Sequence, residues 1–279
     1  MGDEWPTTPR DVVRFYGSDV EVDRLERGIG AVEFERTKEL IARFVRPASA
    51  IADVGGAAGH YAKWLVENGH RVELVDPVPR HLEFARERAG EPPAFGVHLG
   101  DARALPFADE AFDAVLLLGP LYHLGELDDR IAAVREAARV CRSGGVVLAA
   151  AISRAAFLLD CVRLGSILDD RVFGNVQDEL RTGRRVSEER RTAPFPDAYF
   201  HLPDELEADL AAGGLTVEGI YGIEGPSALF ADLDELWRDP DARERVLEVA
   251  RVTETHPQLI VVSSHLLGIA TKPRPGSAV

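Results

Sequence analysis

The sequence predicts an α/β protein whose seven-stranded, mostly parallel sheet carries helices on both faces. Seven short apolar runs suited to buried strands recur along the chain, at 50–54, 72–75, 95–99, 112–118, 145–152, 215–220 and within 259–270. Segments with helical periodicity separate most of these runs, at about 59–68, 79–89, 128–140, 203–212 and 233–252. Strands that alternate with helices in this way form βαβ units, and such units build a parallel sheet.

The segments outside this alternation predict how the chain is organised. An amphipathic run from Glu33 to Val45 stops before Pro47 and indicates a helical cap ahead of the first strand. After the fifth strand the alternation breaks, with a helix expected over 155–168 and then a charged stretch, an insertion typical of a lid. No linker divides the chain. We therefore expect one domain over residues 1–279, made of an N-terminal cap (1–48), a core (49–152), a lid or substrate insertion (153–202) and the C-terminal part of the core sheet (203–279).

Charge and composition narrow the class of partner. The 279-residue chain has a formal net charge of −15, from 32 Lys and Arg against 47 Asp and Glu. A surface of this sign repels phosphate backbones, so no nucleic-acid partner is expected. Two cysteines are too few for a disulfide framework and favour a reducing compartment. The start lacks a signal-peptide pattern and no apolar stretch is long enough to span a bilayer, so we expect a cytoplasmic protein without a membrane partner.

A glycine-rich turn follows the first predicted strand. The segment Asp53-Val54-Gly55-Gly56-Ala57-Ala58-Gly59 leads from that strand directly into a helix. Glycines allow a ligand to approach the backbone closely, and the first turn of a helix offers unpaired N–H groups. The carboxyl end of a central strand is also where an open α/β sheet binds its ligand. The turn therefore predicts a binding site.

Carboxylates follow the next two predicted strands. Asp76 ends the second strand, and Asp101 comes directly after the third. An acid at the first of these places can accept hydrogen bonds from both hydroxyls of a ribose. A carboxylate at the second can accept from the exocyclic amine of an adenine. Each acid alone is as well explained as a solvated turn residue or a helix cap, but with Asp53 they mark three successive strand ends.

These motifs resemble those of class I S-adenosylmethionine (SAM)-dependent methyltransferases. Residues 53–59 resemble the family's D-x-G-x-G-x-G motif, and 100–107, G-D-A-x-x-L-P-F, resemble its adenine-binding segment. Residues 112–124 are similar to its fourth strand and following loop, and 139–145 to its lead-in to strand five. The resemblance covers about residues 50–150 and implies a Rossmann-like fold. The cap and insertion are similar to those of small-molecule methyltransferases, which implies a role in specialised metabolism such as natural product biosynthesis.

The resemblance implies a role for each motif residue, with SAM as the cofactor and S-adenosylhomocysteine as the product. Ala57 stands where the family's middle glycine is usual. An alanine fits such a turn without strain only when its φ is negative, so we expect a slight adjustment of the methionine-side pocket. The implied cofactor-binding residues are Asp53, Gly55, Gly56, Ala57 and Gly59 for the methionine moiety, Asp76 for the ribose with Pro77 beside it, Asp101 and Ala102 for the adenine, and Leu118 and Gly119 near the sulfonium.

The acceptor side is predicted from single residues. Methyl transfer is an in-line displacement in which positioning matters most; a hydroxyl acceptor also needs a base near neutral pKa, whereas an amine can react after desolvation alone. His123 and His201 are the candidate bases and Tyr122 would orient the acceptor, although His201 could equally be a capping or packing residue. The other six histidines are assigned to surface or packing positions. The expected acceptor contacts are Tyr16, Tyr122, His123, Phe195, Tyr199, His201 and Tyr221.

Other classes of protein are weighed against this one. A nicotinamide-dependent oxidoreductase also has an early glycine-rich turn, but Gly55-Gly56-Ala57-Ala58-Gly59 does not fit G-x-G-x-x-G. A nucleic-acid or protein methyltransferase would share the fold, yet the charge disfavours the former and no N-P-P-Y-type loop is present. A SAM-binding protein without transferase activity would show the same motifs. No His, Asp and Glu cluster has metal-ligand spacing, so no metal is expected. The acceptor molecule, the methylated atom (O, N or C) and the oligomeric state, a homodimer included, are left open.

Overall fold

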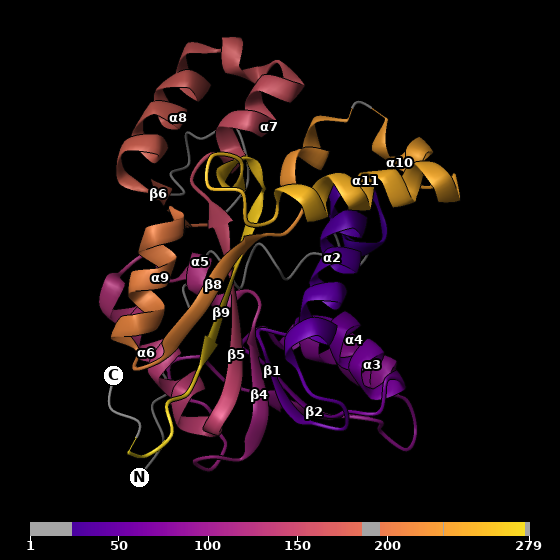
Figure 1. Cartoon of the computed structure of the whole chain (residues 1–279), viewed down its shortest axis with the longest axis vertical. Helices are drawn as coiled ribbons and strands as arrows, with labels where there is room; N and C mark the ends of the chain where they lie inside the picture. The colour runs from indigo at the N-terminus through magenta and orange to yellow at the C-terminus, as the bar shows by residue number, and fades with distance from the viewer. Residues whose placement is uncertain (1–23, 186–195, 231, 277–279) are drawn as a thin grey trace.

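The computed structural model describes residues 24–185, 196–230 and 232–276, and one large sheet forms its centre (Figure 1). Strands β3, β2, β1, β4 and β5 follow one another in parallel. Strand β9 lies antiparallel to β5 and carries β8 on its other side, also antiparallel. The strands of this sheet are β1 (Ala50–Val54), β2 (Arg71–Asp76), β3 (Gly96–Leu99), β4 (Phe112–Leu117), β5 (Cys141–Ser153), β6 (Arg184–Arg185), β7 (Ala198–His201), β8 (Thr216–Gly222) and β9 (His265–Thr271).

Helices cover both faces of the sheet, as predicted. Helices α5 (Pro120–His123), α6 (Leu127–Val140) and α9 (Pro203–Ala212) pack on one face. Helices α2 (Gly28–Phe44), α3 (His60–Glu67) and α4 (Pro79–Ala89) pack on the other. Figure 1 shows the two helical layers on opposite sides of the strands. The arrangement is the Rossmann-like α/β fold expected from the sequence.

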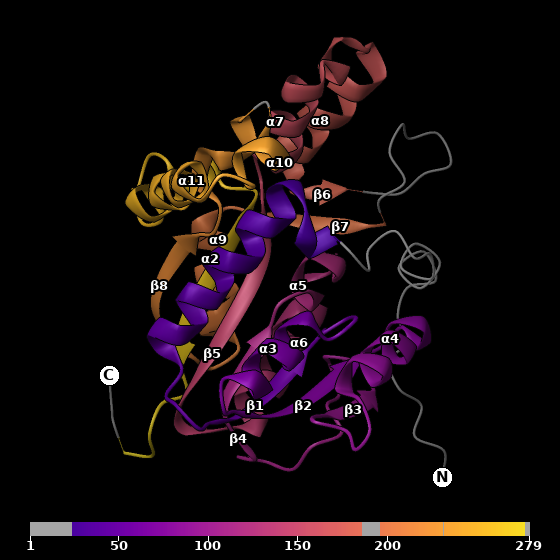
Figure 2. The same ribbon diagram turned by 90° about the vertical axis from the view of Figure 1, so that its right-hand side faces the viewer.

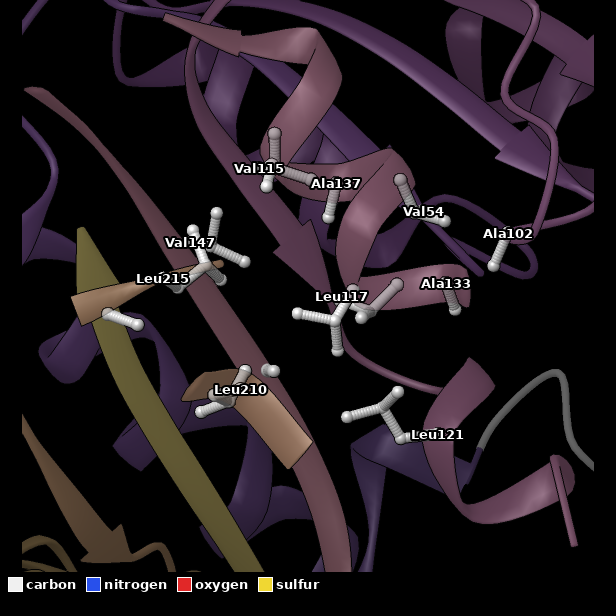
Figure 3. Close-up of a cluster of buried hydrophobic side chains, with 14 of the residues drawn as sticks. Val54, Ala102, Val115, Leu117, Leu121, Ala133, Ala137, Val147, Leu210 and Leu215 are labelled. Carbon is white, nitrogen blue, oxygen red and sulfur yellow. The ribbon is translucent and has the colours of Figure 1, made fainter. Parts of the chain in front are cut away.

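Two apolar clusters fill the space between the sheet and its helices. Along β4, Val115 and Leu117 belong to the cluster under α6 and α9, while Ala114 and Leu116 belong to the cluster under α3 and α4. Figure 3 shows Leu117 directed toward Leu210 of α9. Because both faces are covered, the central strands are apolar at nearly every position, and they appear in the sequence as continuous runs rather than alternating patterns.

The sheet has nine strands rather than the predicted seven, and the two additional strands come from the insertion. Strand β5 continues beyond the end of β4, and its residues Ile152 and Ser153 pair with β7 in parallel. Strand β6 pairs with β7 antiparallel. Strands of two and four residues are too short to leave a periodic hydrophobic pattern, which explains why the sequence did not reveal them.

The described part of the insertion also contains a helix, α8, that was not predicted. Helix α7 (Ala156–Leu164) ends at Gly165, whose φ of 72° stops it before the expected boundary, and η3 (Ser166–Leu168) follows. Helix α8 (Asp170–Thr182) occupies part of the stretch for which only a charged composition was noted. Asp169 caps it by accepting from the backbone N–H groups of Arg171 and Val172. In Figure 1, α7 and α8 project as a pair above the sheet.

A further group of helices packs against α2. Its members are η2 (Arg24–Glu26), η4 (Gly225–Leu229), α10 (Leu233–Leu236) and α11 (Pro240–Thr253), and η5 (Ile260–Val262) follows next to η4 and β8. Val32 of α2 packs between Leu233 and Leu247, and Figure 2 shows α2 running from this group down the face of the sheet. The single helix predicted over 233–252 is divided, because Asp239 caps a new helix that starts at Pro240. Within the described ranges, no helix has the length and apolarity needed to cross a membrane.

Candidate active site

A cavity of about 740 Å³ opens at the carboxyl edge of the sheet. One side of it is formed by the turns that follow β1, β2, β3 and β4, and the other by residues of η2, α2, α7, η4 and the start of β9. Cavities of this size hold a cofactor or a drug-sized ligand. The position is the ligand crevice of an open parallel sheet.

The glycine-rich turn between β1 and α3 is held in a left-handed conformation at two places that face this cavity. Gly55 has a φ of 74°, and a Cβ there would lie 2.7 Å from Cδ of Pro120. Ala57 has a φ of 46° and so does not adopt the negative φ at which an alanine would fit the turn without strain. The backbone N–H of Ala57 donates to Oδ2 of Asp76 at 3.0 Å, and this bond ties the turn to the end of β2. An L-residue in this region carries strain that glycine does not.

Substitution Ala57→Gly therefore stabilises the turn. Relief of left-handed strain, about 1–2 kcal/mol, exceeds the added chain entropy of glycine, roughly 0.5–1 kcal/mol. We expect the free energy of unfolding to rise by about 0.5 kcal/mol, measured by urea denaturation. Ala58→Gly, in the same turn but without a positive φ, is the control and should destabilise the protein.

Asp53, at the end of β1, is a buried acid that lines the cavity. It is fully buried, and neither of its oxygens accepts a hydrogen bond from the described part of the chain. Burial and then the neighbouring Asp76 carboxylate raise the pKa of Asp53 to about 7; the nearby backbone N–H of Ala62 offsets the rise only in part, since it does not meet the geometry of a hydrogen bond. A Cβ at Gly56 would lie 2.7 Å from Oδ2 of Asp53, so glycine there keeps the approach to this oxygen open. Asp53 lines the cavity and is suited to a cationic ligand group.

Asp76 also lines the cavity, but most of its acceptor capacity is already used. Oδ2 accepts from Ala57, while Oδ1 accepts from the backbone N–H of Val78 at 2.9 Å and lies 3.1 Å from Nδ1 of His81. A carboxylate has about four acceptor positions. One position thus remains for a ligand hydroxyl, not the two that a bidentate ribose contact requires.

The other implied cofactor residues lie around the same cavity. Asp101 and Ala102, after β3, and Leu118 and Gly119, after β4, all line it, as does Pro77. Both oxygens of Asp101 accept from the Arg103 guanidinium, each at 2.9 Å, so its carboxylate is firmly oriented. Gly59, by contrast, is not among the lining residues; it precedes α3 with a φ of 80° and packs near Phe95.

Two of the predicted acceptor contacts lie at the cavity. Tyr122 and His123, on α5, line it next to Gly119, and their rings contact each other edge to face with centroids 4.6 Å apart. Tyr16 and Phe195 lie outside the described residues. The structure therefore retains Tyr122 and His123 as candidates on the acceptor side.

Three other predicted acceptor contacts do not line the cavity. His201, proposed as a base, is fully buried on β7, with Nε2 3.2 Å from Oδ2 of Asp209. Asp209 also accepts from Arg130 at 2.6 Å, so His201 belongs to a structural network joining β7, α6 and α9, and the catalytic assignment was wrong. Tyr199 packs on the Arg130 guanidinium in the same network. Tyr221 packs against Phe44 on the far side of β9 from β5.

A charged cluster that was not predicted from the sequence lies at the opposite side of the cavity. Glu33 of α2, Glu224 after β8 and His265 at the start of β9 bring their ligating atoms within 4.8 Å of one another. Glu33 and His265 line the cavity, as does Arg24, whose guanidinium donates to both oxygens of Glu33. These residues are far apart in the chain, so the prediction from ligand spacing along the sequence could not reveal them.

The charges of this cluster stabilise one another. Burial disfavours both ionised forms, but Arg24 and His265 lower the pKa of Glu33 to about 2, and Glu33 and Glu224 raise the pKa of His265 to about 9. His265 is therefore an imidazolium at neutral pH. Because its pKa is higher in the folded state, its stabilising effect is complete below about pH 6.5 and is lost as the pH rises through 9.

His265→Gln tests this assignment. We expect it to lower the free energy of unfolding by about 2–3 kcal/mol near pH 6 and to have little effect above pH 9. Urea denaturation at several pH values measures the difference. Proton NMR of the eight histidines should show one ring titrating near pH 9, and that signal should be absent in the variant. An unchanged set of titrations would contradict the buried ion cluster.

Comparison with known proteins identifies the class. Residues 52–149 match the family model Methyltransf_11, a methyltransferase domain. This segment contains the β1 turn, Asp76, Asp101 and the residues after β4. The match shows that residues 52–149 of the chain are a methyltransferase domain.

Several curated proteins are similar to parts of the chain. A probable tRNA methyltransferase 9B from Mus musculus is 34% identical over 103 residues, which are 37% of this chain and 22% of that protein. Methyltransferase GfsG from Streptomyces halstedii is 34% identical over 39% of this chain and 40% of its own length. A demethylmenaquinone methyltransferase from Mycobacterium sp. (strain KMS) is 27% identical over 64% of this chain and 69% of its own. The match thus covers less than a quarter of the tRNA methyltransferase's length.

Solved structures share the fold over most of the chain. The N-methyltransferase NodS from Bradyrhizobium japonicum, in complex with S-adenosylhomocysteine, aligns over 96% of this chain and 100% of its own with a TM-score of 0.58 at 14% identity. A SAM-dependent methyltransferase from Methanosarcina mazei aligns over 84% of this chain and 97% of its own with a TM-score of 0.56 at 15% identity. The fold therefore extends beyond the segment that matches the family model.

Proposed function

We propose that the protein is an enzyme that binds SAM on the turn side of the cavity and transfers its methyl group to a small-molecule acceptor on the other side. The buried Asp53 carboxylate, which accepts no hydrogen bond from the residues that the structure describes, is the observation that most supports the cofactor, because SAM carries an ammonium group that would pair with it. Gly55, Gly56 and Ala57 would face the methionine moiety and Asp76 one ribose hydroxyl, with Pro77 beside it. Gly59, which does not line the cavity, would contribute only by keeping the turn in its conformation. Asp101 and Ala102 would face the adenine.

The bound cofactor would supply an electrophilic methyl group that departs from a positively charged sulfur. The protein's own contribution is to hold the acceptor in line with that group and to exclude water. Leu118 and Gly119, which line the cavity as Tyr122 and His123 do, would then lie between the cofactor and the acceptor. Tyr122 and His123 are accordingly the proposed acceptor-positioning residues on α5, with His123 as a candidate base.

A small molecule fits the acceptor side better than a nucleic acid does. The cavity is bounded by η2, α2, α7 and the η4–α10 segment, whose apolar residues Leu25, Phe157 and Leu233 line it. The chain's charge of −15 opposes a polyanion. The similarity to tRNA methyltransferases covers 37% of this chain, a share comparable to the cofactor-binding segment, which carries no information about the acceptor.

A labelling experiment separates the two acceptor classes. The protein is incubated with methyl-labelled SAM and either a filtered small-molecule extract of bacterial cells or bulk tRNA. We expect label in the small-molecule fraction and none in acid-precipitable material. Label in tRNA would instead support a nucleic-acid acceptor, and no transfer by a protein that binds S-adenosylhomocysteine would support a binding protein without transferase activity.

We further propose a metal-independent reaction in specialised metabolism. Carboxylates and backbone N–H groups suffice to bind the cofactor, and methyl transfer from a sulfonium needs no Lewis acid. Dialysis against EDTA should therefore leave labelling unchanged, while loss of labelling restored by Mg²⁺ would contradict it. The two free cysteines, Cys141 and Cys161, accord with a cytoplasmic location.

A further inference from the structure

His265 lines the cavity opposite the glycine-rich turn and is paired with a buried carboxylate. Its Nδ1 lies 2.5 Å from Oε1 of Glu224, which is completely buried. The other oxygen of Glu224 accepts from Oγ of Ser263 at 2.8 Å and from the backbone N–H of His265 at 2.9 Å. Both carboxylate oxygens are thus committed, and the imidazole is fixed in one orientation.

The second ring nitrogen of His265 remains available to a ligand. Nε2 makes no hydrogen bond to the described part of the chain, and it is not among the buried atoms left without a partner. The side chain of His265 retains 17% of its exposure and lines the cavity. A histidine held at one nitrogen by a carboxylate and open at the other is the arrangement that proton-transferring enzymes use.

The register of the sheet gives the distance between His265 and Leu118, which is proposed to lie near the cofactor's sulfonium. Leu117 of β4 pairs with Ala149 of β5, and Ile152 of β5 pairs with His265 of β9. By this register Leu118 is level with Ala150 of β5, two residues before Ile152. The backbone of His265 therefore lies two strands away from Leu118 and two residues further along the strand direction. Strand spacings of about 4.8 Å and rises of about 3.3 Å per residue put the two backbones roughly 12 Å apart. A histidine side chain and one small ring fill such a gap.

The charged and apolar groups around His265 determine which kind of ligand it can bind. Glu33, from α2, lies 3.7 Å from Nδ1 and is itself paired with Arg24, so both carboxylates lie on the Nδ1 side of the ring. Nε2 therefore offers a proton to a ligand oxygen. The remaining lining near the cluster is largely apolar, including Leu25, Ile29 and Ile223. The ligand complementary to this wall is an apolar molecule with one acidic oxygen.

We propose that His265, oriented by Glu224, binds and ionises the reacting oxygen of the methyl acceptor, and that the acceptor is a phenol or an enol. This inference rests on the proposed methyltransferase function. The acceptor's O–H bond breaks, its electron pair stays on oxygen, and the proton moves to Nε2 of neutral His265 or to solvent when His265 is already protonated. The oxyanion is then held by the Nε2–H donor. Glu224 is a positioning residue that also keeps the ring basic.

The same cluster has the composition of a divalent cation site, and the observations favour the acid–base role. Three ligating groups lie within 4.8 Å, but both oxygens of Glu33 are bound by Arg24 and Nδ1 of His265 is bound by Glu224. A cation would have to displace Arg24 and the imidazole proton together. Cation binding is therefore an outcome that the experiment must distinguish.

The test uses 4-nitrophenol, whose anion absorbs visible light, at a pH about one unit below the probe's own pKa, with protein saturated by S-adenosylhomocysteine. We expect the bound probe to be ionised, with phenolate absorbance per bound molecule about fivefold or more above that of free probe. His265→Gln should abolish the increase. Glu224→Gln should reduce it while the probe still binds. His98→Gln is the matched control. The Nε2 atom of His98 lies 2.6 Å from Oε2 of Glu73 in a similar pair, but His98 does not line the cavity, so this variant should behave as wild type.

Each outcome decides the proposal. Absence of the phenolate signal in wild type, or an equal signal in His265→Gln, overturns it, and so does tight Zn²⁺ binding that His265→Gln and Glu33→Gln both abolish. If His265→Gln does not fold, proton NMR of the wild type replaces it: the ring titrating near pH 9 must shift on addition of 4-nitrophenol. S-adenosylhomocysteine affinity is measured in every variant. Unchanged affinity with a lost phenolate signal isolates His265, whereas no affinity in wild type rejects the underlying function instead.

Discussion

Substitution Asp53→Asn should make the protein more stable and a poorer binder of S-adenosylhomocysteine. Burial and Asp76 raise the pKa of Asp53 to about 7, so above that pH the folded state carries an unpaired buried charge. The amide removes that charge, and we expect the free energy of unfolding to rise by about 1–3 kcal/mol at pH 8. Because an acid with a raised folded pKa destabilises only when ionised, the gain should shrink as the pH falls and vanish below about 4.

The same substitution removes the charge that would pair with the ligand's ammonium. The dissociation constant of S-adenosylhomocysteine should increase about 10- to 100-fold, the scale of a hydrogen bond between charged groups. Denaturation curves and calorimetric titrations measure the two effects. Asp109→Asn, on an exposed ion pair, is the control and should change neither. Loss of both stability and affinity would mean that Asp53 has a structural partner instead of a ligand role.

Substitution Asp76→Ala should have the largest combined effect on binding and stability. Its carboxylate fixes Ala57, Val78 and His81, so alanine leaves two backbone N–H groups unpaired and releases the glycine-rich turn. We expect the free energy of unfolding to fall by about 2–3 kcal/mol and the affinity for S-adenosylhomocysteine by about 1.5–3 kcal/mol.

Asp76→Asn separates the two contributions. The amide keeps one acceptor oxygen, so part of the turn's hydrogen bonding survives, and stability should fall by about half as much as in the alanine variant. Affinity should fall in both. If the alanine variant binds S-adenosylhomocysteine as wild type does, the ribose contact has been assigned to the wrong residue.

The cofactor side of the site could be predicted because its residues are local in the sequence. The turn after β1, Asp76 and Asp101 each follow a strand directly, and parallel strands bring such ends to one edge. The central strands β1, β4 and β5 were predictable as well, since strands buried on both faces are continuously apolar. The φ of Ala57 was not predictable, because the Ala57 N–H bonds to Asp76 at the end of the neighbouring strand β2.

The acceptor side could not be predicted, because it is assembled from distant segments. Glu33, Glu224 and His265 come from α2, the turn after β8 and the start of β9, and nothing in their local sequence distinguishes them from surface charges. His201 lies next to a helix start, as expected, but its ring points into a buried network with Asp209. Whether His201 faces the cavity or the core depends on how β7 pairs with the part of β5 that extends beyond β4. The amino-acid composition does not determine that pairing.

Calorimetric titration of the full chain with S-adenosylhomocysteine at pH 7, in two buffers of different ionisation enthalpy, tests the central claim most directly. Asp53 is about half protonated at that pH when free and ionised when paired, so binding of one ligand per chain should release about half a proton, and Asp53→Asn should abolish the release. A well-folded protein that gives no heat with this ligand, or that binds it without proton release, would contradict the account.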